Sequence, residues 1–251
     1  MQEIRGLLFD IGGVLYVGET VIEGAPQTMR ELGRRFPMRF LTNTTRRVPA
    51  AMLKKLNAFG FEVEEAQLFT ALSATRAFLS SRHATALTVM TDEAAAYFEK
   101  LYSENPDFVV VGDAHTNFDY PHLNHAFKAL MNGAELIAAA KNRYFKEEDG
   151  SLAMDAGGFI AALEYASGKE ATIIGKPSRT FFHLAVDAMG LKPHEVLMVG
   201  DDIEADIKGA QDAGLKAALV KTGKFQAEDL SRGIVPDAVL ETVSDLPALL
   251  A

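Results

Sequence analysis

Three short apolar runs that each stop abruptly at a polar residue constrain the fold of this chain more than any other feature. The runs and the residues that end them are 5–9 before Asp10, Met38–Leu41 before Thr42-Asn43, and Val196–Val199 before Gly200-Asp201-Asp202. Runs of this length, bounded by turn residues, are typical of strands buried on both faces of a parallel sheet. Because ligands bind at the carboxyl ends of such strands, we expect the polar ends to meet in one crevice.

Helix and strand patterns alternate near both ends of the chain and weaken in the middle. Near the ends, helices are predicted at 25–36, Pro49–Phe59, Ser178–Met189 and Ile203–Ala213, and further strands at Ala217–Val220 and Ala238–Leu240. Residues 68–100 and 126–140 are predicted to be mostly Ala-rich helix, with strand candidates at Leu87–Thr91, Phe108–Val111 and Leu136–Ala139. An irregular segment at 141–158 precedes a helix at Phe159–Ala166 and a strand at Thr172–Ile174. The alternation predicts an α/β core with a parallel sheet, made of residues 1–72 and 173–251, and an inserted domain at 73–172.

Composition and charge exclude several classes of partner. With a net charge of −9 and no block of Lys and Arg, the chain lacks the basic face of a nucleic-acid binder. No apolar run reaches membrane-spanning length and no secretory pattern opens the sequence, so we expect a soluble, cytoplasmic protein with no membrane partner. The absence of cysteine excludes a disulfide framework and a thiolate nucleophile. The sequence leaves both a monomer and a homodimer open.

Asp10 is the first candidate for chemistry. A carboxylate at a strand end, followed by Ile11-Gly12-Gly13, suits nucleophilic attack on phosphorus, because the glycines let the backbone curl around it. The N–H groups after the strand can hold phosphate oxygens. An ordinary strand-end Asp before a glycine turn has the same local sequence, so Asp10 alone leaves both interpretations open.

Two further segments carry groups suited to phosphate. Thr42-Asn43 offers a hydroxyl and an N–H near a strand end, although a helix cap or a simple turn would use the same residues. Lys176, in Gly175-Lys176-Pro177-Ser178, can neutralise a phosphoryl oxygen and keep a nearby carboxyl ionised. A solvated loop lysine is the alternative.

Acidic residues cluster at the third strand end. Asp201 and Asp202 follow the strand directly, and Asp206 lies in the next predicted helix. Magnesium prefers hard oxygen ligands and keeps several waters, so two carboxylates and a phosphate suffice to bind it. Helix capping is the alternative use of such residues.

These four elements, in this order, resemble the haloacid dehalogenase (HAD) superfamily of phosphohydrolases, and the resemblance covers nearly the whole chain. It implies a Rossmann-like parallel-sheet core in which Asp10 is the nucleophile and Lys176 the catalytic lysine. It also implies that the substrate's phosphoryl group is bound by Asp10, Ile11, Gly12, Thr42, Asn43 and Lys176. The implied cofactor is Mg²⁺, held by Asp10, the Gly12 carbonyl and Asp201, with Asp202 and Asp206 in supporting roles.

The large insertion is similar to the C2-type cap of subfamily IIA, which includes nucleotide, sugar and 4-nitrophenyl phosphatases. The segments Phe159–Ala166 and Thr222-Gly223-Lys224-Phe225 add to this resemblance. Residues 142–146 (Asn-Arg-Tyr-Phe-Lys) lie in the irregular part of the insertion. They either face the crevice or form a solvated cap loop.

One position departs from the family pattern. Most members carry a second Asp, a general acid and base, two residues after the nucleophile, and here that position is Gly12. General acid–base help is worth about 10²–10⁴ in rate, or roughly 3–5 kcal/mol. An alkoxide leaving group needs that help, whereas phosphate leaving pyrophosphate needs it much less. The phospholysine and phosphohistidine phosphatases of this subfamily resemble the chain in this respect.

The sequence is compatible with three functions. The first is a magnesium phosphohydrolase of small compounds with good leaving groups, such as pyrophosphate, phosphoramidates, and acyl or aryl phosphates. The second is a phosphatase of small phosphomonoesters, such as sugar or nucleotide phosphates. The third is a phosphate-binding or regulatory protein that lost turnover with the second Asp. The presence of Asp10, Lys176 and Asp201 argues against the third.

Overall fold

The computed structural model describes residues 4–146 and 151–251, and its largest element is a six-stranded sheet. The strand order is β14-β13-β12-β1-β4-β5, and every neighbouring pair is parallel. The strands are β1 (Gly6–Asp10), β4 (Met38–Thr42), β5 (Leu68–Thr70), β12 (Val196–Gly200), β13 (Lys216–Val220) and β14 (Ala238–Leu240). This confirms the predicted α/β fold class, and it places the two apolar runs that end at Thr42 and Gly200 on either side of β1.

Helices cover both faces of this sheet because its strands are apolar on both sides. Leu7 and Phe9 pack toward one face and Leu8 toward the other, and all three are fully buried. The helices are α1 (Ala25–Gly33), α2 (Pro49–Ala58) and α9 (Leu246–Leu249) on the first face, and α7 (Arg179–Asp187) and α8 (Gly209–Asp212) on the second. Full burial of each such Leu or Phe side chain contributes about 1.5–3 kcal/mol, so the hydrophobic sandwich fixes the sheet register.

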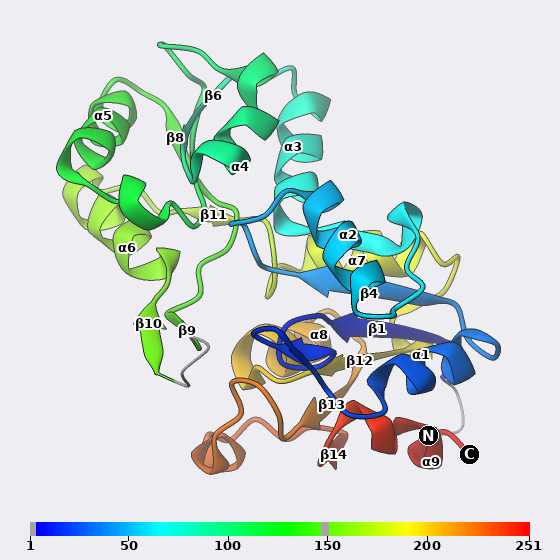
Figure 1. Cartoon of the computed structure of the whole chain (residues 1–251). Coiled ribbons are helices and arrows are strands. Elements are labelled where there is room, and N and C mark those ends of the chain that lie inside the picture. The colour runs from blue at the N-terminus through cyan, green and yellow to red at the C-terminus, as the bar shows by residue number, and fades with distance from the viewer. Residues whose placement is uncertain (1–3, 147–150) are drawn as a thin grey trace.

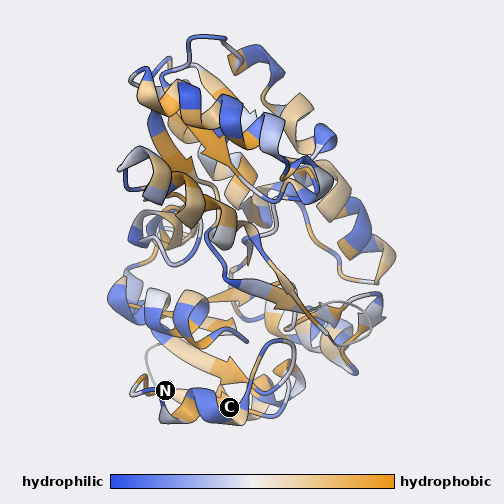
Figure 2. Cartoon of the chain, turned by 90° about the vertical axis from the view of Figure 1, so that its left-hand side faces the viewer, coloured by the Kyte–Doolittle hydropathy of each residue, from blue (hydrophilic) through white to orange (hydrophobic). Residues whose placement is uncertain are grey.

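A second, four-stranded parallel sheet lies above the first in Figure 1. Its order is β11-β8-β7-β6, with β6 (Ala86–Val89), β7 (Phe108–Val111), β8 (Glu135–Ala138) and β11 (Thr172–Ile173). The helices α5 (Tyr120–Met131) and α6 (Ala156–Ser167) pack on one face, and α3 (Ala71–Ser81) and α4 (Asp92–Tyr97) on the other. We call this unit the cap; its predicted boundaries, 73 and 172, remain a prediction. Figure 2 shows the hydrophobic strands of both units enclosed by helices with hydrophilic outer faces.

Two antiparallel hairpins complete the described fold. They are β2 (Tyr16–Val17) with β3 (Thr20–Val21), and β9 (Tyr144–Lys146) with β10 (Leu152–Met154). No helix in the described ranges is long and apolar enough to cross a membrane.

Three local predictions were wrong. Residues 68–70 form the edge strand β5 instead of helix, since they pair with β4. The segment 141–158 is not irregular throughout: it contains β9 and β10, which pair with each other although their sequences have weak strand propensity. Helix α6 starts at Ala156 and not at Phe159, because the Asp155 side chain accepts a hydrogen bond from the Ala156 N–H. The predicted turn at Asp149-Gly150 lies outside the described residues.

Candidate active site

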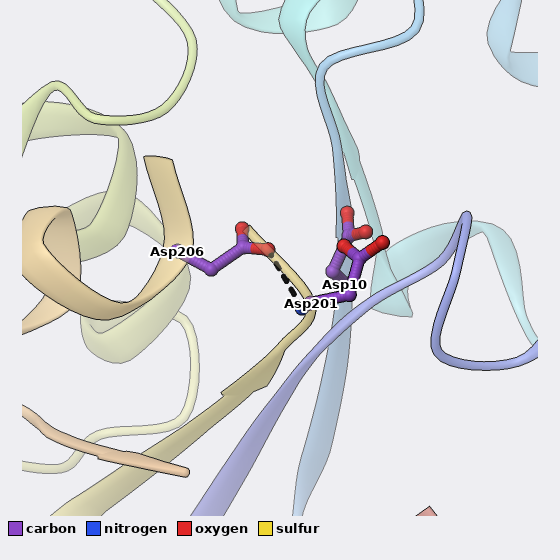
Figure 3. Close-up of side chains that lie close together, drawn as sticks. All are labelled: Asp10, Asp201 and Asp206. Carbon is purple, nitrogen blue, oxygen red and sulfur yellow. Dashed lines mark hydrogen bonds between the residues drawn. The ribbon is translucent and has the colours of Figure 1, made fainter. Parts of the chain in front are cut away.

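Three buried carboxylates meet where β1 and β12 end. Asp10 is the last residue of β1, Asp201 follows β12, and Asp206 lies in the π-helical turn after that strand. Because β1 and β12 pair in parallel with Phe9 opposite Val199, the residues that follow emerge side by side. One oxygen of each carboxylate lies within 4.8 Å of the others. Figure 3 shows Asp10 and Asp201 adjacent, with Asp206 reaching across to the backbone of Asp201.

Lys176 brings a buried positive charge to these carboxylates. Its ammonium forms an ion pair with Asp10, and its Nζ lies 2.7 Å from Asp206 Oδ1. Burial alone would lower the pKa of Lys176, but Asp10 and Asp206 raise it above its ordinary value. The lysine is therefore protonated at neutral pH and carries a positive charge next to the Asp10 carboxyl group.

Two glycines, Gly13 and Gly223, let the backbone approach the Asp201 carboxylate closely. Gly13 and Gly223 both have positive φ angles, of 87° and 61°, and a Cβ on either would overlap that carboxylate. The Lys224 N–H donates to Asp201 Oδ2 at 2.7 Å. Asp206 Oδ2 accepts from the N–H groups of Asp201 and Asp202, both at 3.2 Å. Both oxygens of Asp206 are thus engaged, which fits a supporting role.

Negative charge exceeds positive charge at this point of the structure. Four carboxylates face two ammonium groups: Asp10, Asp201, Asp202 and Asp206 against Lys176 and Lys224. Burial, with the neighbouring Asp10 and Asp206, raises the pKa of Asp201 well above its ordinary value. Burial also raises the pKa of Asp206 to about 6, although Lys176 acts in the opposite direction. Two uncompensated charges on hard oxygen donors fit a divalent cation such as magnesium.

The remaining predicted residues surround this cluster. Thr42 ends β4, next to β1, and its hydroxyl accepts from the Thr44 N–H at 3.1 Å. The Asn43 side chain binds the Lys176 backbone twice, with its Oδ1 2.8 Å from the amide nitrogen and its Nδ2 2.8 Å from the carbonyl oxygen. The Ile11 side chain is buried in the core, so only its backbone can contact a substrate. Gly12 is exposed to the cavity, and a Cβ added there would meet nothing within 4 Å.

A cavity of about 270 Å³ opens over the cluster, and the cap forms part of its wall. Of residues 142–146, for which the sequence left a crevice-facing and a solvated position open, Asn142 and Phe145 line this cavity. Arg143 and Tyr144 line a neighbouring cavity of about 230 Å³ instead. The side chain of Lys146 lies outside what the structure describes.

The sequence analysis did not identify Tyr16, Arg46, Asp113 and Asp155, which also line the cavity. Asp113 carries a signal that could have been used, because it follows the carboxyl end of β7 just as Asn142 follows β8. The rule that ligands bind at carboxyl ends of parallel strands therefore applies to both sheets, whose ends face one cavity. Burial and the nearby Asp10 raise the pKa of Tyr16 to about 12, so its phenol stays protonated.

Comparison with known proteins identifies the family to which this chain belongs. Residues 7–103 match the family model described as haloacid dehalogenase-like hydrolase, and residues 173–246 match the HAD-hydrolase-like model. Human haloacid dehalogenase-like hydrolase domain-containing protein 2 is 39% identical over 229 residues, 91% of this chain and 88% of that protein. The chain therefore belongs to the haloacid dehalogenase-like hydrolase family, as the motifs predicted, and it is an enzyme.

Other relatives and solved structures agree with this assignment. Human phospholysine phosphohistidine inorganic pyrophosphate phosphatase is 37% identical over 233 residues, 90% of this chain and 86% of that protein. This confirms the predicted resemblance to that branch. The crystal structure of 4-nitrophenylphosphatase from Thermotoga maritima superposes with a TM-score of 0.90 at 26% identity, covering 98% of this chain and 97% of that one. NagD from E. coli K-12 gives 0.85 at 25% identity, covering 97% and 98%.

Proposed function

We propose that the chain is a magnesium-dependent phosphohydrolase that transfers the phosphoryl group of a small substrate to Asp10 and then to water. The observation that carries the proposal is the ion pair of Asp10 with the buried Lys176, beside two further buried carboxylates. An ionised carboxylate at a strand end can attack phosphorus, and the lysine can offset charge on the phosphoryl oxygens.

The first step follows from this arrangement. An Asp10 oxygen forms a bond to phosphorus while the bond from phosphorus to the leaving group breaks. We infer that the Thr42 hydroxyl, the backbone after β1 and the Asn43 backbone N–H bind the phosphoryl oxygens, and the presence of Thr42, Gly12 and Asn43 in the cavity wall supports this. Magnesium held by Asp10, Asp201 and the Gly12 carbonyl would neutralise negative charge that Lys176 alone leaves uncompensated.

The second step restores the carboxylate. Water attacks the phosphorus of the aspartyl-phosphate, the bond from Asp10 to phosphorus breaks, and inorganic phosphate leaves. The proton that the attacking water loses passes to solvent or to a nearby base. Gly12 supplies no such base. Asp202 is a weak candidate, because both of its oxygens are engaged, with the Glu204 and Ala205 N–H groups at 3.0 Å and with Lys224 Nζ at 3.4 Å.

The substrate is a small phosphorylated compound with a good leaving group. Gly12 has no side chain to protonate a departing oxygen, so a leaving group that is already stable as an anion, or arrives protonated, is favoured. The names of two relatives support this: one is named for phospholysine, phosphohistidine and pyrophosphate, and another for 4-nitrophenyl phosphate. A cytoplasmic location remains a prediction.

A substrate panel tests the proposal against its two alternatives. Turnover of inorganic pyrophosphate, acetyl phosphate and a sugar phosphate is measured with magnesium present. We expect acetyl phosphate and pyrophosphate to be cleaved much faster than the sugar phosphate. Faster cleavage of the sugar phosphate would favour a phosphomonoesterase, and no turnover of any member would favour a phosphate-binding protein.

A further inference from the structure

The Asn43 side chain joins the Lys176 backbone to the cap. Besides its two hydrogen bonds to Lys176, its Nδ2 donates to Oδ1 of Asn142 at 3.2 Å. Asn142 belongs to the cap, in the segment that follows β8. The carboxamide of Asn43 is buried and all of its polar atoms have partners on these two residues, so it cannot rotate without losing them.

The chain of hydrogen bonds continues into the cap. Asn142 Nδ2 donates to Asp155 Oδ2 at 3.0 Å, and Asp155 Oδ1 accepts from the Ala156 N–H at 2.7 Å, where α6 begins. The Gly157 N–H also donates to the Asn142 carbonyl at 3.0 Å. Asn142 is therefore fixed at both its side chain and its backbone to the first turn of α6.

Gly175 permits this close approach. Its N–H donates to the Ala139 carbonyl at 2.9 Å, which ties the segment before Lys176 to the end of β8. A Cβ at Gly175 would lie 2.5 Å from Asn43 Oδ1 and 2.7 Å from that carbonyl oxygen. The segments after β4, after β8 and before α7 thus converge on one amide group.

We propose that Asn43 is a positioning residue that couples the seating of the cap to the placement of the Lys176 ammonium, with Asn142 and Asp155 as its anchor in the cap. The inference deepens the proposed function, because it assigns a role in placing the lysine that contacts Asp10. When the cap seats over a substrate, the carboxamide of Asn43 is held and Lys176 is fixed. When the cap lifts, the bond to Asn142 is lost and the Lys176 backbone loses one constraint.

Amide hydrogen exchange of Lys176 tests the coupling without any turnover. The Lys176 N–H is protected by Asn43 Oδ1, so Asn142→Ala should speed its exchange about tenfold. The matched control is Lys141→Met, one residue away, which breaks the ion pair with Glu164 at 2.8 Å but touches neither Asn43 nor Lys176. The control should leave the exchange unchanged. Equal exchange in native protein and Asn142→Ala would overturn the proposal.

A rescue experiment then separates positioning from general damage to the cap. Asn142→Asp keeps an acceptor for Asn43 but sets a second carboxylate against Asp155, which breaks the series of hydrogen bonds at that point. Adding Asp155→Asn restores a donor and acceptor in reversed order and keeps an oxygen for the Ala156 N–H. On acetyl phosphate we expect kcat to fall about tenfold in the single variant, with a smaller change in KM, and to return to within about threefold of native in the double variant.

The two experiments also distinguish the inference from the proposed function. If no substrate is turned over, the proposed function fails, while the exchange of Lys176 still decides whether Asn43 is coupled to the cap. If native turnover is normal and the double variant is no better than Asn142→Asp, the coupling is wrong and the proposed function stands.

Discussion

Gly12→Asp is the most informative single substitution, because the structure shows that the position can accept a side chain. A Cβ at Gly12 meets nothing within 4 Å, the backbone there is not left-handed, and the residue faces the cavity. Gly13 is the opposite case: its φ is 87° and a Cβ would overlap the Asp201 carboxylate. The turn therefore needs its second glycine and not its first, and Gly12→Asp should fold normally.

The size of the effect follows from the chemistry of the leaving group. A well-placed general acid contributes about 10²–10⁴ in rate. An introduced carboxyl lacks supporting contacts, so we expect it to recover about 10–10² in kcat/KM on an alkyl phosphate, or roughly 1.4–2.7 kcal/mol. The nearby excess of carboxylates raises the pKa of a new one, which favours the protonated form that donates. Acetyl phosphate has a stable leaving group and should change by less than about threefold.

The assay is a plot of log kcat/KM against leaving-group pKa for native protein and variant. We expect a steep negative slope in the native protein and a shallower one in Gly12→Asp. Gly12→Asn is the matched control, since it has nearly the same shape and can donate a hydrogen bond but cannot transfer a proton. Its slope should stay at the native value.

Two results would refute this reasoning. A shallow slope in the native protein, unchanged by Gly12→Asp, would mean that another group already supplies the proton. An equal gain in Gly12→Asn would mean that shape or hydrogen bonding, and not proton transfer, limits the rate.

Three further predictions concern the nucleophile, the metal and the cap. Asp10→Asn should abolish turnover yet leave the melting temperature equal or higher, because it removes one of the excess carboxylates; near-normal activity would disprove the aspartyl-phosphate. Removal of divalent metal with EDTA should abolish activity and added magnesium should restore it, whereas full activity in EDTA would exclude the proposed cofactor. Small phosphorylated compounds should be turned over and an intact folded phosphoprotein should not, since the cap walls a cavity of about 270 Å³; comparable rates on both would contradict this.

Much of the core could be predicted from the sequence because short apolar runs identify its central strands without knowledge of the rest of the fold. Residues 6–9 and Val196–Val199 are apolar throughout, and Met38–Leu41 is apolar except for Arg39; strands buried on both faces have this pattern. The edge strand β5 was missed because it has only three residues, Leu68–Thr70, and so short an apolar run cannot be distinguished from part of a helix by its pattern. Its pairing with β4, and not its own composition, makes it a strand.

The predicted site residues lie together for the same reason. Asp10, Thr42 and Asp201 come at the ends of strands that are neighbours in the sheet, so the order of strands brings them close whatever the length of chain between them. Lys176 does not lie at the end of a core strand but on the segment that follows β11 of the cap sheet. Its ion pair with Asp10 agrees with the role that the family resemblance implied.

The contribution of the cap could not be predicted, because it rests on pairs that no local pattern specifies. Asn43 and Asn142 are 99 residues apart, and neither sequence context differs from that of an ordinary turn. What brings them together is the arrangement of two parallel sheets with their carboxyl ends facing one cavity. In that arrangement both units contribute to the wall, so a group at the end of a core strand can contact the cap directly. Asn43 lies at that point of contact, between the lysine and the cap, and the sequence assigned a role only to its N–H and not to its side chain.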